Sequence, residues 1–281
     1  MVIIYLLVAG VCLGSFINAL VWRVHEQEKR KSKKYTKADL ARLSILKGRS
    51  MCPNCSHKLA LKDLIPVLSW LSLKGKCRYC HKAISLQYPL VELITTLVFI
   101  VSYIFWPIPI KGLEIAIFSS WLVLLTGLIA LAIYDLRWLI LPNRIIYPLL
   151  YLALVIAALN IAFKPNHLTA LVNEVLAMLI GGGIFYVLFQ ISKGKWIGGG
   201  DVRLGLILGL SIGTPGSSIL VIFLASVMGS LISIPLMFTH KLKKNSVIPF
   251  GPFLIVSAII VQLVGHFILS WYNNTFFPYG V

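Results

Sequence analysis

The stretch VIIYLLVAGVCLGSFINALVW, residues 2–22, carries no charged side chain anywhere along its length. A helix needs roughly 20 apolar residues to cross the hydrocarbon core of a bilayer, so this run predicts a transmembrane helix. A cleaved signal peptide is the alternative. The basic residues follow the run instead of preceding it, and no small-residue cleavage site closes it, which favours a retained anchor.

Similar apolar runs recur along nearly the whole chain, in which 58% of the residues are hydrophobic and 12% are charged. This composition is typical of a polytopic membrane protein. We expect an all-α fold with about eight transmembrane helices, near residues 2–22, 89–110, 113–134, 145–163, 168–192, 202–213, 217–239 and 247–272. The sixth run is short and is followed by GTPG at 213–216, which predicts a half-length, broken, strongly tilted or re-entrant helix.

The basic residues predict the orientation. Alternate connections hold 24 of the 26 Lys and Arg, and they cover residues 23–88, 135–144, 193–203 and 240–244. The opposite side holds two, Lys111 and Lys164. Positively charged connections stay in the cytoplasm, so we expect both termini outside and these four connections inside. The net charge of +17 then reflects topology and attraction to anionic lipids, and no nucleic-acid partner is expected.

Two of the nine acidic residues stand out by position. Asp135 ends the third run, in AIYDLRW, and Asp201 begins the sixth, in KWIGGGDVRLG at 195–205. The fourth and fifth runs form one hairpin between them, so both carboxylates return to the cytoplasmic leaflet. A carboxylate at the edge of the bilayer is costly unless it is paired or functional. Two on one face indicate an aspartic protease.

In such an enzyme one carboxylate takes a proton from water while the other, still protonated, polarises the scissile carbonyl. The helix macrodipole favours an anion at Asp201, which begins a helix, and disfavours one at Asp135, which ends one. We therefore expect Asp201 to be the initial base and Asp135 the initial acid of a pair that titrates as a unit. Gly198, Gly199 and Gly200 permit unusual backbone dihedrals and close approach of a substrate strand; a flexible entry to a helix is the alternative for them.

Four of the five cysteines form two CxxC pairs, Cys52 with Cys55 and Cys77 with Cys80, separated by 21 residues. In a reducing cytoplasm this pattern predicts a structural zinc site in which the four thiolates bind the metal tetrahedrally. Two disulfides are the alternative if the orientation is inverted. CRYCH also matches a c-type haem attachment sequence, but the cytoplasmic placement and the second CxxC pair disfavour haem.

Together these motifs resemble those of the type IV prepilin peptidases, membrane aspartyl proteases with a GxGD signature that GGGD at 198–201 matches. The motifs that carry the resemblance further are GSFINALVWR (14–23), CPNC, PVLSW, CRYC, YPLVE (88–92) and YDLRWLILPN (134–143). The resemblance implies a multi-pass enzyme of the bacterial inner membrane. It would cut type IV prepilins and pseudopilins on the cytoplasmic side of their hydrophobic segment, after a glycine, with Asp135 and Asp201 as the catalytic pair.

The same resemblance implies that the new terminal residue is N-methylated from S-adenosylmethionine. It also suggests a functional role for Glu92, for which a helix-dipole or lysine-paired structural role is the alternative. We expect three parts in the chain: a transmembrane anchor over 1–22, a cytoplasmic basic and zinc-binding domain over 23–88, and a GxGD aspartyl protease membrane domain over 89–281.

Other classes of protein make different demands on the sequence. A presenilin-like intramembrane protease of other substrates shares GxGD but has no reason to carry the cysteine-rich connection. A proton-coupled transporter would show internal repeats, which this sequence lacks. A zinc-binding membrane scaffold would explain the cysteines and leave Asp135 and Asp201 without a role.

Overall fold

The computed structural model describes residues 1–30, 43–45, 48–238 and 248–276. Over these residues the regular structure is helical, with no strand beyond two isolated β-bridges. The all-α fold is therefore confirmed. Among the described residues, seven helices are long and apolar enough to cross a membrane: Val2–Lys29, Gln87–Ile104, Glu114–Trp138, Asn143–Phe163, His167–Ser192, Pro215–Phe238 and Gly251–Phe276. The chain divides into two compact units, Met1–Ile104 and Phe105–Val281.

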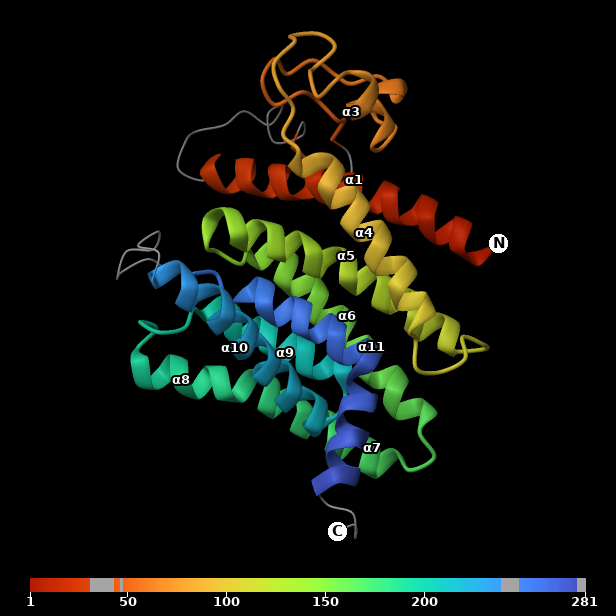
Figure 1. Cartoon of the computed structure of the whole chain (residues 1–281), viewed down its shortest axis with the longest axis vertical. Coiled ribbons are helices and arrows are strands. Elements are labelled where there is room, and N and C mark those ends of the chain that lie inside the picture. Colours follow the sequence, from red (N-terminus) through yellow and green to blue (C-terminus); the bar gives the residue numbers. More distant parts are fainter. Residues whose placement is uncertain (31–42, 46–47, 239–247, 277–281) are drawn as a thin grey trace. The chain divides into compact units, whose positions relative to one another are not determined.

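The first unit contains α1 (Val2–Arg30), η1 (Leu61–Asp63), α3 (Leu68–Ser72) and α4 (Gln87–Ile104). Helices α1 and α4 pack against each other, as Figure 1 shows. The contact is close because Gly10 and Gly14 lie one turn apart on α1. A Cβ atom on either glycine would lie 2.6 Å from the Cα atom of Thr96 or Glu92, respectively. Small residues at this spacing let transmembrane helices approach closely enough for backbone contact.

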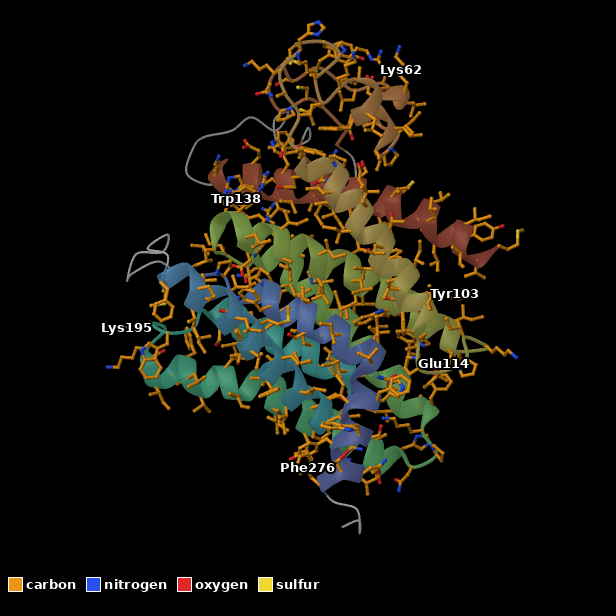
Figure 2. All side chains as sticks on the ribbon, viewed as in Figure 1. Lys62, Tyr103, Glu114, Trp138, Lys195 and Phe276 are labelled. Atoms are coloured by element: carbon orange, nitrogen blue, oxygen red, sulfur yellow. The ribbon has the colours of Figure 1, made fainter. Side chains whose placement is uncertain are left out.

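Over residues 105–238 and 248–276 the second unit has eight helical elements. They are α5 (Glu114–Trp138), α6 (Asn143–Phe163), α7 (His167–Met178), η2 (Leu179–Gly183), α8 (Ile184–Ser192), α9 (Gly199–Ile212), α10 (Pro215–Phe238) and α11 (Gly251–Phe276). The middle of α5 forms much of the core, where Leu124, Leu128 and Leu131 are fully buried. Figure 2 shows Glu114 and Trp138 at opposite ends of this helix.

Helix α9 is the short sixth element. Its 14 residues rise about 21 Å, less than the roughly 30 Å of a hydrocarbon core. Helices α6, α7, α8, α10 and α11 all contact it, so neighbouring helices cover it. The helix stops at Gly213, whose φ of 71° places it in the left-handed region that ends helices. The protein thus has seven long helices and one of half length among its described residues.

Close glycine contacts also hold α9 in place. A Cβ atom on Gly181, in the π-helical turn η2, would lie 2.6 Å from the carbonyl oxygen of Gly205 and 3.1 Å from the Cα atom of Gly209.

The expected division of the chain after residues 22 and 88 stays a prediction. By compactness, α4 groups with α1 in the first unit.

Candidate active site and metal centre

Asp135 lies in the last turn of α5 and is 5% exposed. The helix continues past it to Trp138 and ends because Leu139 adopts a left-handed conformation with a φ of 54°. The Leu139 N–H donates a hydrogen bond of 2.8 Å to the carbonyl oxygen of Asp135. The end of α5 therefore fixes the backbone from which this carboxylate projects.

Asp201 is the third residue of α9, and its backbone N–H donates to the carbonyl oxygen of the N-cap residue Gly198 at 3.1 Å. Its carboxylate turns back toward the N–H of Gly198. This is the half of a capping box that an acidic residue at the third helical position supplies. The first turn of α9 therefore orients Asp201 and places the carboxylate at the positive end of the helix dipole.

The three glycines before Asp201 differ in their surroundings. A Cβ atom on Gly200 would lie 2.9 Å from the Cβ of Leu141, so a side chain at residue 200 would force Leu141 and the start of α9 apart. A Cβ on Gly198 would lie 3.4 Å from Oδ2 of Asp201, and one on Gly199 would only touch the Phe189 ring at 3.8 Å. Close packing thus explains Gly200, while Gly198 lies beside the carboxylate.

The structure brings the two aspartates together within the second unit. Their carboxylates lie close enough for their charges to interact, and the Gly251 N–H at the start of α11 faces the Asp135 carboxylate. Leu204, one turn after Asp201, also lies beside Gly251. Trp138 and Lys195, which follow Asp135 and precede Asp201 in the chain, lie toward the same end of this unit in Figure 2. The ends of three helices therefore meet around one pair of carboxyl groups.

Gly251 is a residue of this site that the sequence motifs did not predict. A Cβ atom there would lie 2.7 Å from Oδ2 of Asp135. The available signal was PFGP at 249–252, a glycine between two prolines at the entry to an apolar run. The motifs also did not predict the hydrogen bond that Arg203 donates to the side chain of Asn143, which ties α9 to the first residue of α6 near the pair.

Glu92 lies in the first unit, so the structure does not place it with the aspartates. It is 5% exposed, and its Oε2 atom accepts a 2.7 Å hydrogen bond from the backbone N–H of Val67. Val67 has a φ of 59°, a conformation that β-branched residues rarely adopt. Glu92 therefore holds the turn of the PVLSW segment.

The four cysteines of the CxxC pairs come together in the first unit, with all four Sγ atoms within 4.8 Å of one another. The Sγ atoms of Cys52 and Cys80 are 3.9 Å apart. Tetrahedral coordination with Zn–S bonds of about 2.3 Å requires sulfur–sulfur distances of roughly 3.8 Å. The cluster can therefore hold a metal ion of this kind.

The two CxxC loops have the same backbone construction. In the first, the N–H of Ser56 donates to the carbonyl of Cys52, and the N–H of Cys52 donates to that of His57. In the second, the N–H of His81 donates to the carbonyl of Cys77, and the N–H of Cys77 donates to the carbonyl of Lys82. Each loop thus points its two sulfur atoms toward a common centre.

The thiols differ in acidity when no metal is bound. Burial raises the pKa of Cys52 to about 11. Burial also acts to raise the pKa of Cys77, but the backbone N–H groups of Cys80 and Tyr79 favour its thiolate and lower the pKa to about 7. Because a metal ligand must be a thiolate, metal binding here releases protons and weakens as the pH falls.

A carboxylate next to the cysteines supports the second loop. Asp63 accepts hydrogen bonds from Arg78 Nε at 2.7 Å, from the Tyr79 hydroxyl at 3.0 Å and from the Ala60 N–H at 3.2 Å. Burial acts to raise the pKa of Asp63, but these donors outweigh it and hold the pKa below its usual value. The residues between the cysteines of the second loop are thereby tied to η1.

Two protein-family models match this chain and together cover most of its length. The chain matches the bacterial peptidase A24 N-terminal domain over residues 8–106 and the type IV leader peptidase family over residues 122–234. The chain belongs to the type IV leader peptidase family. The family resemblance of its motifs is therefore confirmed, and the protein is a protease.

Curated relatives of this peptidase align along most of its length. A prepilin leader peptidase/N-methyltransferase of Aeromonas salmonicida (strain A449) is 31% identical over 94% of this chain and 91% of the relative. A type 4 prepilin-like proteins leader peptide-processing enzyme of Escherichia coli O78:H11 is 32% identical over 90% of both chains. A prepilin leader peptidase/N-methyltransferase of Bacillus subtilis (strain 168) is 31% identical over 82% of this chain and 87% of the relative.

No solved structure is significantly similar to this leader peptidase. Its seven apolar helices and its bacterial relatives identify it as an inner-membrane protein.

Proposed function

We propose that this protein removes the leader peptide from type IV prepilins and pseudopilins at the cytoplasmic face of the inner membrane. The supporting observation is the meeting of Asp135 and Asp201, from the ends of two helices, beside the Gly251 N–H. The names of the relatives supply the substrate class. The distribution of Lys and Arg supports a cytoplasmic active site with both termini outside.

In the proposed mechanism a water molecule lies between the two carboxyl groups. Asp201 takes a proton from this water, whose oxygen attacks the scissile carbonyl carbon, while Asp135 donates its proton to the carbonyl oxygen. The tetrahedral intermediate then collapses. Asp201 passes its proton to the leaving nitrogen and Asp135 recovers its own from a hydroxyl group, so the pair returns to its starting state.

The helix ends support these roles. Asp201 lies at the positive end of α9 and faces the Gly198 N–H, an arrangement that suits a base that starts as an anion. Asp135 lies at the negative end of α5, which suits an acid that starts protonated. The Gly251 N–H orients the Asp135 carboxyl group.

We propose methyl transfer to the new amino terminus as a second activity, with S-adenosylmethionine as the methyl donor. The names of the Aeromonas and Bacillus relatives support it. We also propose that Cys52, Cys55, Cys77 and Cys80 hold a structural zinc ion. The spacing of their sulfur atoms supports this. When bound, the metal would crosslink the two CxxC loops.

Replacement of each aspartate tests the peptidase mechanism. Asp135→Asn and Asp201→Asn keep the shape of each side chain and remove its acid–base chemistry. We expect each variant to lose leader cleavage of a co-expressed prepilin by at least about a hundredfold. Glu114→Gln, at the opposite end of α5 (Figure 2), is the control and retains activity. Cleavage that survives both aspartate replacements contradicts the proposed mechanism.

The two activities can be measured separately. Mass spectrometry of the mature pilin reports leader removal and the methyl group on the same peptide. We expect the aspartate variants to lose the first modification, and with it the substrate for the second. A presynthesised mature amino terminus should still be methylated by Asp201→Asn. A loss of methylation on that peptide would contradict separate chemistry for the two reactions.

A further inference from the structure

We propose that the exposed face of α10 between Phe223 and Pro235 is a docking track for the apolar transmembrane helix of the substrate. This inference rests on the proposed leader-peptidase function. It adds the surface that holds the substrate and the residues that position its cleavage site.

One face of α10 packs on the other helices of the second unit through Ser218, Val221 and Ala225, which are buried. The other face carries Ser226, Ser230 and Ile234, which are exposed. These three residues are four positions apart, so they form one line along the helix. The two serines of this line are small and leave room for the backbone of another helix to approach.

Two hollows flank this line. One of about 430 Å³ lies on the side of Phe223, Val227 and Leu231, and one of about 390 Å³ lies on the side of Gly229 and Ser233. Both have Ser226, Ser230 and Ile234 in their walls. Both hollows open widely to the surface, as expected of a face that receives another helix along its length. The surface is thus a continuous trough, which we call the α10 track.

The chemistry of the α10 track specifies an apolar helix. Its walls carry no charged side chain among the described residues. Its serines add hydroxyl groups to a helix face where lipid offers no partner. Ser226 and Ser233 donate hydrogen bonds to carbonyls of their own helix, at 2.8 and 2.6 Å, whereas Ser230 bonds to no described residue. A hydroxyl in hydrocarbon gains stability when a neighbouring helix supplies a partner.

The position of the α10 track identifies this helix as the substrate's. The second hollow is also lined by Ile248, Pro249, Phe250 and Phe253, which precede and begin α11. Phe250 adjoins Gly251, the residue that faces the Asp135 carboxylate. The end of the track that Phe250 lines is therefore next, in the chain, to the residue that contacts Asp135. A helix that carries its scissile bond at its cytoplasmic end would present this bond to Asp135 and Asp201.

Gly229 helps to shape the end of the α10 track. A Cβ atom there would lie 3.6 Å from the ring of Phe253 and 3.9 Å from that of Phe250, so both rings lie against the glycine. Both rings line the second hollow, and their residues lie on either side of Gly251 in the chain. We infer that they set the depth at which the substrate helix stops and therefore which bond reaches the aspartates.

Photocrosslinking tests the track directly. A small aliphatic diazirine amino acid, which leaves the trough open, replaces Ser230 in the Asp201→Asn variant, in membranes that contain an uncleaved prepilin. The matched control carries it at Ile232, which is exposed on α10 and lies outside both hollows. We expect a crosslink from position 230 to the apolar segment of the prepilin and at least about tenfold less from position 232.

Kinetics supply a second measurement that does not depend on trapping. Ser230→Trp should raise the KM for full-length prepilin at least about tenfold, because the ring fills the trough. It should leave cleavage of a short peptide that spans the junction without the apolar segment unchanged. Ile232→Trp, which lies outside both hollows, should behave as wild type toward both substrates.

Several results would overturn the proposal. A crosslink from position 230 to a second copy of this chain would make the trough a self-interface, and a crosslink to lipid alone would make it an ordinary lipid-facing surface. Equal KM values for Ser230→Trp and Ile232→Trp would also contradict it. Failure of the peptidase mechanism is distinguishable, because Asp201→Asn would then cleave prepilin. The product keeps the apolar segment, so the crosslink from position 230 to that segment is still measured separately from cleavage.

Discussion

The backbone of Gly251 lies against the carboxyl group of Asp135, so closely that a Cβ atom at residue 251 would be 2.7 Å from Oδ2. Gly251 is buried at the start of α11, and Asp135 is buried at the end of α5. Two helices far apart in the chain thus determine the position of one carboxyl group.

This contact predicts that Gly251→Ala impairs catalysis more than folding. The added methyl group displaces the Asp135 carboxyl group, and a displacement of about 1 Å at a reacting group can cost about a hundredfold in rate. We expect kcat for prepilin cleavage to fall about ten- to a hundredfold with little change in KM. Gly216→Ala is the control, because its Cβ would make ordinary contacts of 3.6 Å with Leu269. Equal kcat values for the two variants would contradict a role for the Gly251 contact.

Packing around α9 predicts a different pair of effects. A Cβ atom on Gly181 would lie 2.6 Å from the Gly205 carbonyl oxygen, whereas one on Gly183 has no atom within 4 Å. Gly181→Ala must therefore move α9, which carries Asp201. We expect a loss of about 1–3 kcal/mol in stability, the usual range for overpacking, together with a loss of cleavage. Thermal unfolding in detergent should show wild-type behaviour for Gly183→Ala. A neutral Gly181→Ala would contradict the tight packing of α9.

Helix α5 shows how far the sequence predicts the fold. Uninterrupted apolar runs locate helices well, since α5 was expected over 113–134 and extends over Glu114–Trp138. The extension past Asp135 escaped prediction because polar residues do not end a helix whose backbone hydrogen bonds can continue. Leu139 ends it by a left-handed conformation that leucine seldom adopts and that its residue type does not indicate.

Prediction of the site was limited for a similar reason. The sequence predicts that both carboxylates lie at one membrane face, because this prediction needs only the two-helix hairpin between Asp135 and Asp201 and the distribution of charged residues. Gly251 depends on how α11 packs on α5, and packing partners of apolar helices in lipid leave little trace in hydropathy. The roles of Gly198 and Glu92 likewise depend on contacts with the backbone N–H groups of particular residues.

The cysteine cluster predicts one bound metal ion per chain. Cys52→Ser removes one of four thiolates from a site in which the sulfur atoms lie within 4.8 Å of one another. We expect the purified variant to lose zinc, as measured by elemental analysis, and to become more sensitive to proteolysis between residues 50 and 85. Cys12→Ser, in α1, should retain both the metal and the protection. A full complement of zinc in Cys52→Ser would exclude a four-cysteine site.

The contacts of Asp63 predict a dependence of stability on pH. Its pKa in the folded protein lies below the usual value, so its contribution to stability is fully present above about pH 4. That contribution is lost as the pH falls through the lowered pKa. We expect Asp63→Asn to be less stable than wild type at neutral pH and the difference to shrink in acid. Zinc loss affects both proteins, so the difference between their unfolding curves isolates Asp63. A difference that is constant with pH would contradict this assignment.

The contact between Glu92 and Val67 predicts that Glu92→Ala lowers the stability of the protein and that Val67→Gly does not. Glu92→Ala leaves the half-buried Val67 N–H without its 2.7 Å acceptor, and the loss of a hydrogen bond costs about 0.5–1.5 kcal/mol. Glu92→Gln keeps an acceptor oxygen and should lose less.

Val67→Gly removes the side chain from a residue with a φ of 59° and a ψ of −52°, and relief of such a sparsely populated conformation is worth about 1–3 kcal/mol for residues other than glycine. This variant should therefore be at least as stable as wild type. Thermal unfolding of the purified, metal-loaded protein measures all three variants. A loss of stability in Val67→Gly as large as that in Glu92→Ala would show that the valine side chain, not the carboxylate, holds the turn.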